Sequence, residues 1–394
     1  MTSCVTRPPA IPASDFDTLP WGALALDINA DNSEYTLKES MGEVLRKKIH
    51  EANAGDSTTA LNILALSGGG SGGAYGAGLL NGWKDHGDIP QFDIVTSVST
   101  GSIMSSFAFL GGDYIDQLDS IFRNLETSDL YVSSWLSLFN GATLNDPTPL
   151  KNLLRDGIDE QFLAEIAREH QKGRRLYMGT TNLDTGQLVV WDMGAIASSD
   201  RTDKLQRYRD IIYASSAVPI IFPPHFFNLD IDGNSYSQMH VDGGVYSNVF
   251  MIGLYVDWMS ELQLTIKNDI KIKTNLYMIA NRKYRERHAY DPMPLKFSPV
   301  FDAFITVETD LLFDRSVYRI YNSIQDRNID FHIATIPQDA NHIQSMMEFV
   351  PKEMRAIYGI AYDKASNGYP WKKEIRWNEY DLQGDKDQLN SNHH

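Results

Sequence analysis

A short β-branched run that breaks into a serine and then into a helix constrains this chain most. Ile94, Val95 and Val98 predict a buried strand, and residues 103–110 predict a helix that two glycines close. Ser99 lies between them, so we expect a tight elbow that exposes its side chain at the top of a sheet. The next N–H then points into the same space, where it can help to hold an oxyanion. Ser99 is therefore the candidate nucleophile.

The surrounding residues form an incomplete G-x-S-x-G motif. Ser97 stands at the first glycine position, Thr100 follows the nucleophile, and Gly101 keeps the second glycine. A small residue still lets strand and helix approach closely. Taken alone, a serine at a helix start is more often an N-cap, so the assignment depends on the other motifs of the chain.

A glycine-rich loop precedes the elbow. Residues 61–66 predict a buried strand and residues 74–83 a helix of small residues. Between them lie Gly68, Gly69, Gly70, Ser71, Gly72 and Gly73. A strand, a glycine loop and a helix, followed by the strand and helix of the elbow, predict an α/β fold with a mainly parallel sheet.

Such a loop can surround an anion with backbone N–H groups, and the identity of the anion decides the function. The loop satisfies G-x-G-x-x-G, which raises dinucleotide binding as an alternative. The expected acidic ribose ligand is misplaced, because Asp88 lies in a turn and Asp93 begins a strand. The other possible anion is the oxyanion of an attacked ester.

Two later motifs favour the ester. Residues 213–224 are rich in Ala and Ser and end in Phe-Pro-Pro, and Val241-Asp242-Gly243-Gly244 follows. With the glycine loop and the elbow, in this order, these segments resemble the patatin-like phospholipases over residues 63–248. The resemblance implies a three-layer fold, with a central mainly parallel sheet flanked by helices. It also implies that Ser99 is the nucleophile, Asp242 its base, and the backbone around Gly69 and Gly70 the oxyanion hole.

The implied activity is that of a serine lipid acyl hydrolase, a phospholipase A or esterase that needs neither cofactor nor metal. Its partner would be a phospholipid or another acyl-ester lipid. Many members of the family carry an arginine in the glycine loop where Gly72 aligns here. Independently of the family, Asp242 ends a strand-like run, and Gly243 and Gly244 let the backbone turn sharply beside its carboxylate.

Two alternatives remain open. An α/β-hydrolase would combine Ser99 with a later carboxylate and a late histidine such as His332 or His342. A non-catalytic module would instead use the glycine loop to bind a nucleotide or a lipid.

The net charge and the N-terminal residues bear on the partners and the location of the protein. The net charge of -16 over 394 residues opposes binding to nucleic acid, so any membrane contact would be peripheral and apolar. Cys4 is the only cysteine and is followed by a polar, Pro-rich segment, which resembles the cleavage end of a bacterial lipoprotein signal. This predicts a cell-envelope lipoprotein anchored at Cys4, or else a secreted protein. No stretch of the chain predicts a transmembrane helix.

We expect four parts: an extension with a packing helix at residues 1–55, a catalytic domain at 56–285, a C-terminal part on the same domain at 286–382, and a polar tail at 383–394. Helices are predicted at 34–53, 151–169 and 301–323, two strands within 176–191, a sheet strand at 275–280 and an edge strand at 331–337. Arg282, Lys283, Arg285 and Arg287 predict a solvated basic loop.

Overall fold

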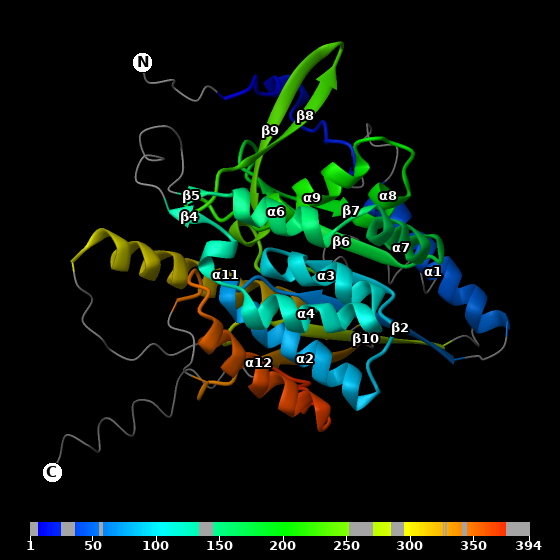
Figure 1. Ribbon diagram of the computed structural model, residues 1–394. Coiled ribbons are helices and arrows are strands. Elements are labelled where there is room, and N and C mark those ends of the chain that lie inside the picture. Colours follow the sequence, from blue (N-terminus) through cyan, green and yellow to red (C-terminus); the bar gives the residue numbers. More distant parts are fainter. Residues whose placement is uncertain are drawn as a thin grey trace.

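The computed structural model is an α/β protein with a central, mostly parallel sheet between two layers of helices (Figure 1). It describes residues 7–24, 36–54, 58–133, 145–251, 271–284, 295–325, 327, 329–340 and 345–375. The predicted fold class is confirmed. Cys4, His342 and the tail at 383–394 lie outside the described residues, as do Arg285 and Arg287.

Within the described residues, the sheet has nine strands. Its main path runs in the order β1-β7-β6-β3-β2-β10-β11, and β9 pairs with both β6 and β8. The strands are β1 (Ala23–Leu24), β2 (Thr58–Leu66), β3 (Ile94–Ser97), β6 (Arg175–Asn182), β7 (Gln187–Asp192), β8 (His225–Ile231), β9 (Asn234–Asp242), β10 (Lys271–Ala280) and β11 (Ile329–Thr335). The five consecutive strands β6, β3, β2, β10 and β11 are parallel to one another, whereas β7 is antiparallel to β6. A separate short pair joins β4 (Val132–Ser133) and β5 (Asn145–Asp146).

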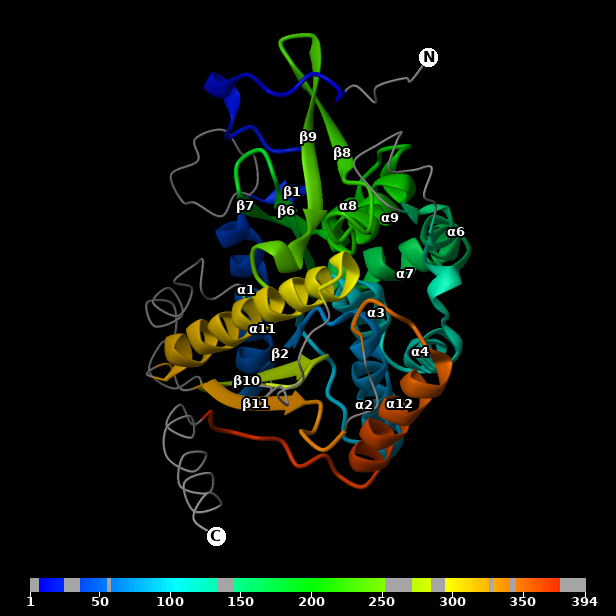
Figure 2. The same cartoon turned by 90° about the vertical axis from the view of Figure 1, so that its left-hand side faces the viewer.

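Helices cover both faces of the sheet (Figure 2). One face carries α2 (Gly73–His86), α3 (Thr100–Leu110), α4 (Asp113–Asn124) and α12 (Pro351–Ser366), and the other carries α1 (Leu37–Ala54) and α11 (Phe297–Ile324). Alternate residues of β2 explain this arrangement. Leu61 and Ile63 pack in the hydrophobic core beneath α1 and α11, whereas Leu64 and Leu66 pack in the core on the opposite face, beneath α2, α3, α4 and α12. The remaining helices are α6 (Thr148–Gly157), α7 (Glu160–Gln171), α8 (Met193–Ser198) and α9 (Lys204–Ser215), with short 3-10 turns η1 (Ala13–Asp15), η2 (Gly70–Gly72), η3 (Thr127–Asp129) and η4 (Gly243–Val245).

The C-terminal part contributes β11 to the same sheet and one helix to each helical layer, α11 on one face and α12 on the other. β11 pairs with β10 at the edge of the sheet, as predicted for residues 331–337. α12 packs closely on α2, because a Cβ built on Gly78 or Gly82 would lie only 2.3 or 2.4 Å from a carbonyl oxygen of α12. None of the helices in the described ranges is long and apolar enough to cross a bilayer.

Two local predictions are wrong. Residues 151–169 form two helices, not one, because the chain leaves helical geometry at Ile158 and Asp159 then caps α7 by accepting the N–H of Phe162 at 2.8 Å. Arg282 does not lie in a solvated loop, since it is buried, donates to the carbonyl of Thr309 at 2.8 Å and pairs with Asp310.

Candidate active site

Ser99 lies at a strained elbow between β3 and α3. Its backbone has φ 54° and ψ -131°, in the left-handed half of conformational space that side chains rarely adopt. Such a residue costs about 1 to 3 kcal/mol and persists only where its surroundings hold it in place. The side chain stays partly accessible, whereas every residue of β3 is buried.

The Ala/Ser-rich segment at the end of α9 holds the elbow. The N–H of Ser99 donates to the carbonyl oxygen of Ser215 at 3.0 Å and to its Oγ at 3.1 Å. The hydroxyl of Ser216 donates to the carbonyl of Ser99 at 3.2 Å, and that of Ser215 to the carbonyl of Gly179 at 2.7 Å. Sequence reasoning used this segment only as a family signature. The two consecutive serines were the available signal for its role in positioning.

The small residues around the elbow serve close packing. A Cβ built on Gly101 would lie 2.7 Å from the carbonyl oxygen of Leu66, so α3 meets the end of β2 here. Ser97, at the first glycine position, is buried, and its Oγ lies 3.3 Å from that of Ser102. Thr100 is also buried, at the point where the absent side chain of Gly73 leaves it room.

Asp242 ends β9 and is brought to Ser99 by the same segment. Its N–H donates to the carbonyl of Ala217 at 2.9 Å. Its carboxylate, 4% exposed, accepts the N–H of Gly244 at 2.7 Å, and the side chain of Ser99 lies close enough to affect its pKa. Burial raises the pKa of Asp242 to about 7, although the hydroxyl of Ser99 and the N–H of Gly244 lower it in part. A carboxylate with such a pKa can accept a proton near neutral pH.

The turn after Asp242 requires glycine. A Cβ built on Gly243 would lie 2.4 Å from the carbonyl oxygen of Gly179 in β6, and one built on Gly244 3.0 Å from Oδ1 of Asp242. The sequence predicted this sharp turn beside the carboxylate. The sequence did not indicate that the turn would pack directly against β6.

The glycine-rich loop presents two backbone donors. The N–H groups of Gly68, Ser71 and Gly72 donate to carbonyl oxygens at 2.9 to 3.0 Å. The N–H groups of Gly69, Gly70 and Thr100 have no acceptor within the described part of the chain. The loop is therefore built to offer N–H groups at the end of β2, next to the elbow.

Gly72 has no room for the arginine that many patatin-like proteins carry. A Cβ built there would lie 2.1 Å from the carbonyl oxygen of Asn281, at the end of β10. Gly70 is equally confined, with φ 51° and a built Cβ 1.9 Å from the carbonyl oxygen of Met346. Replacement of either glycine would thus disturb the packing of the loop as well as any anion bound to it.

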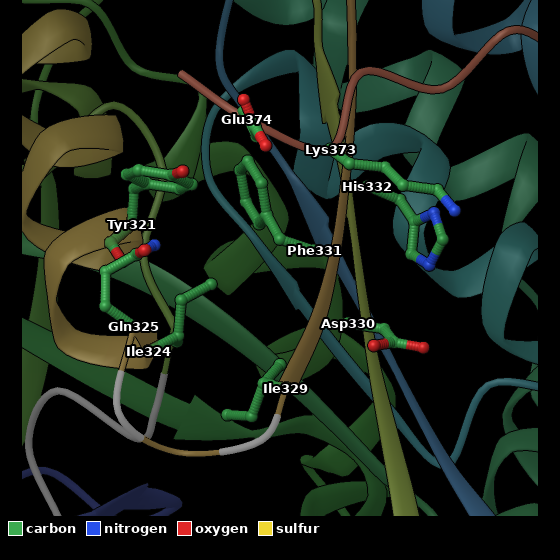
Figure 3. Close-up of a pocket in the computed structure, with 9 residues that line it drawn as sticks. All are labelled: Tyr321, Ile324, Gln325, Ile329, Asp330, Phe331, His332, Lys373 and Glu374. Atoms are coloured by element: carbon green, nitrogen blue, oxygen red, sulfur yellow. The ribbon is translucent and has the colours of Figure 1, made fainter. Parts of the chain in front are cut away.

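Of the two histidines considered for a triad, His342 lies outside the described residues and His332 lies away from Ser99, and the nearby His240 has another partner. His240 is fully buried and bonded through Nδ1 to Thr180 at 2.8 Å, and burial lowers its pKa to about 3. His332 lies on β11, which β2 and β10 separate from β3, and lines a cavity of about 320 Å³ with Asp330 and Lys373 (Figure 3). Among the residues that the structure describes, no histidine is hydrogen-bonded to Ser99 or Asp242.

Neither aspartate considered as the ribose ligand of a bound nucleotide is placed for that role. Asp93 is buried, pairs with Lys48 at 2.7 Å and accepts the N–H of Asn62 at 2.9 Å, so it anchors the start of β3. Asp88 is exposed in the turn after α2. Within the described ranges, no group of three or more His, Cys, Asp or Glu side chains could hold a metal ion.

Sequence reasoning missed two asparagines at the site. Asn281 accepts the N–H of Gly76 at 3.1 Å and donates to the carbonyl of Ser67 at 2.8 Å, which ties β10 to both ends of the glycine loop. Asn248 follows the Asp-Gly-Gly turn, and its carbonyl oxygen accepts the N–H of Gly68 at 2.9 Å. No periodicity marks either residue, since each acts through contacts between distant segments.

Residues 64–254 match the family described as patatin-like phospholipase, so this part of the chain is a patatin-like phospholipase domain. Two similar curated proteins are patatin group D-3 and patatin group M-3 of Solanum tuberosum, 25% identical over 161 residues and 26% identical over 165 residues. The alignments cover 39% and 41% of this chain and equal shares of the two patatins, so the match spans about two fifths of their length. A similar solved structure is that of VipD from Legionella pneumophila, with a TM-score of 0.38 and 13% identity over 78% of this chain and 66% of that chain.

Proposed function

We propose that this chain is a serine lipid acyl hydrolase, a phospholipase A or esterase that uses Ser99 and Asp242 as a catalytic dyad. The observation that carries the proposal is the approach of Ser99, at a strained elbow, to the buried carboxylate of Asp242, whose pKa is raised to about 7. A patatin-like phospholipase domain over residues 64–254 supports a lipid ester as the substrate.

In the first half of the reaction, Ser99 Oγ attacks the carbonyl carbon of the ester. Its proton passes to the Asp242 carboxylate, which is within hydrogen-bond reach and needs no imidazole between. The tetrahedral intermediate then collapses, and the alcohol leaves with the proton that Asp242 holds. The acyl group remains on Ser99 as an ester.

The N–H groups of Gly69, Gly70 and Thr100 would stabilise the oxyanion. They have no acceptor within the described residues, and they belong to the loop and the elbow that flank Ser99. Donors held by the fold before the substrate arrives need little reorganisation, and loss of one typically costs ~100-fold to ~1000-fold in turnover. The absence of space at Gly72 supports an oxyanion hole of backbone donors only.

A serine-directed fluorophosphonate probe and a panel of lipid classes test the proposal. We expect the probe to label Ser99 and the enzyme to release fatty acid, and Ser99→Ala to lose both while its melting temperature stays near that of the parent. Labelling of Ser97 or Ser102, or undiminished hydrolysis by Ser99→Ala, would transfer the role to another residue. Stabilisation by nucleotides without any labelling would instead favour the non-catalytic module.

Attachment to an envelope membrane through Cys4 accompanies this proposal, because an acyl hydrolase of lipids acts at a lipid surface. Mass spectrometry of the protein from its native host tests it. An acylated Cys4 would support the anchor, and an unmodified Cys4 would reject it.

A further inference from the structure

Asn248 carries a buried acceptor that the dyad does not explain. Its side chain is 4% exposed, and its Oδ1 has no hydrogen-bond partner among the described residues. A buried polar atom without a partner is costly, so most such atoms in folded proteins bind another group or a water molecule. Oδ1 of Asn248 therefore needs a donor that the described protein atoms do not supply.

The amide lies beside both members of the dyad. A Cβ built on Gly68 would be 3.3 Å from Oδ1 and 3.5 Å from Nδ2 of Asn248, and 3.1 Å from the Cβ of Ser99. A Cβ built on Gly244 would be 3.4 Å from Nδ2 and 3.0 Å from Oδ1 of Asp242. The absent side chains of two glycines thus leave room for the amide near both the nucleophile and the base.

Hydrogen bonds to neighbouring segments hold the backbone at Asn248. Its carbonyl oxygen accepts the N–H of Gly68, at the start of the glycine loop. The hydroxyl of the preceding Ser247 donates to the carbonyl of Val249 at 2.8 Å and is 3.0 Å from Oγ of Ser316 in α11. The position of the unpartnered oxygen is consequently fixed by the fold.

We propose that Oδ1 of Asn248 holds the water molecule that hydrolyses the acyl-enzyme, an inference that rests on the proposed function. Water is the one donor that the second half of the reaction must bring to this place. One hydrogen of the water is donated to Oδ1 of Asn248, and the other faces the Asp242 carboxylate.

The water oxygen attacks the carbonyl carbon of the Ser99 ester while Asp242 takes its proton. The intermediate then breaks the bond between that carbon and Ser99 Oγ, which leaves with the proton from Asp242. The products are the free carboxylic acid and the Ser99 hydroxyl, so atoms and charge balance. Asn248 touches only the water, and it therefore acts in deacylation and not in acylation.

Comparison of the two half-reactions tests the inference. The protein is mixed with excess p-nitrophenyl butyrate. The release of nitrophenolate gives acylation, and the loss of the acyl mass from Ser99 after desalting gives deacylation. For Asn248→Leu, which has a similar volume and no acceptor, we expect acylation within ~3-fold of the parent and deacylation slowed by ~10-fold to ~100-fold. The acyl-enzyme should then accumulate in the intact mass spectrum.

Asn248→Asp provides a second, nearly isosteric variant that keeps an acceptor. Its deacylation should stay closer to the parent than that of Asn248→Leu, with the acid limb of its pH profile moved to higher pH, because two carboxyl groups then share the site. Asn275→Leu is the matched control, since Asn275 lies on β10 and bonds to Asn62 at 2.8 Å, outside the site. Both of its half-reactions should be unchanged.

Equal slowing of both half-reactions in Asn248→Leu would assign Asn248 to packing and overturn the inference. Unchanged deacylation would overturn it as well. A parent enzyme that hydrolyses the ester without ever carrying the acyl group on Ser99 would instead refute the proposed function, and the inference with it. Should Asn248→Leu fail to fold, Asn248→Ala supplies the same comparison.

Discussion

Asp192 and Asp242 end two strands that both pair with β6, and both are buried, yet their surroundings differ. Asp192, 1% exposed, accepts the N–H of Ala195 at 2.9 Å and the hydroxyl of Ser40 at 3.0 Å. Nε of Arg175 is 3.8 Å from the same carboxylate. Asp242 accepts the N–H of Gly244 and lies beside the side chain of Ser99, and no cation forms a salt bridge with it within the described residues.

The difference separates an anchor from a base. The guanidinium of Arg175 and the two hydrogen-bond donors hold the Asp192 carboxylate in place at the end of β7. A carboxylate with two donors and no counter-charge holds its proton up to near neutral pH, so it can accept and release one during a reaction. Both carboxylates are buried, so their hydrogen-bond and ion-pair partners are what distinguish them.

The largest expected effect is on turnover in Asp242→Asn. The amide keeps the volume of the carboxylate but cannot take the proton of Ser99, so we expect turnover to fall by ~100-fold to ~10,000-fold. Steady-state hydrolysis of a p-nitrophenyl ester measures it. Histidine substitutions are the control, since His225, His240, His332 and His342 replaced singly should each leave appreciable activity. A histidine variant that loses activity while Asp242→Asn keeps it would restore a triad.

The next effect is the pH dependence of stability in the same variant. With a pKa of about 7 in the folded state and about 3.9 in the unfolded state, Asp242 stabilises the parent protein fully below pH ~4. This contribution is lost as the pH rises to about 7, because the folded state alone then still holds the proton. Asn does not titrate, so the free energy of unfolding of Asp242→Asn should gain on the parent by roughly 4 kcal/mol across this window.

Urea denaturation of both proteins between pH 4.5 and 8 measures this gain. The other titrating groups are common to both proteins and cancel in the difference. A constant difference across the window would contradict a raised pKa for Asp242.

Asp192→Asn should lower the stability of the fold and leave turnover nearly unchanged. Loss of the charge leaves Arg175 without one of its buried partners, and we expect the free energy of unfolding to fall by about 3 kcal/mol. Turnover per folded molecule should stay within ~3-fold of the parent, because Asp192 forms no contact with the site. Active-site titration with the fluorophosphonate separates the two quantities. A large loss of turnover per titrated site would show that the two carboxylates are coupled.

The smallest effect concerns the support of the elbow. Ser215→Ala removes the hydroxyl that accepts the N–H of Ser99 but keeps the carbonyl that accepts it too. We expect a loss of about 1 kcal/mol in stability and a few-fold loss of turnover. Ser106→Ala is the matched control, because its buried hydroxyl is bonded to Tyr208 at 2.7 Å and not to the elbow. Equal turnover of the two variants would show that the elbow does not need Ser215.

The sequence by itself determined the α/β class and the order of the local units. The change from strand to glycine loop to helix is a property of neighbouring residues, so the patterns at Leu66 and at Ser99 could be read directly. The same holds for the edge strand β11 and the long helix α11. Local reading failed at Ile158, where the chain leaves helical geometry, Asp159 caps a new helix, and one apolar pattern is divided between two helices.

Only the tertiary structure decided which polar groups meet. Ser99, Ser215, Asp242 and Asn248 come from separate segments, and no periodicity records their contacts. The raised pKa of Asp242 likewise depends on the packing that removes water from the carboxylate and, in the described part of the chain, brings no cation to it. These properties arise from long-range packing and desolvation, which the spacing of residues along the chain does not encode.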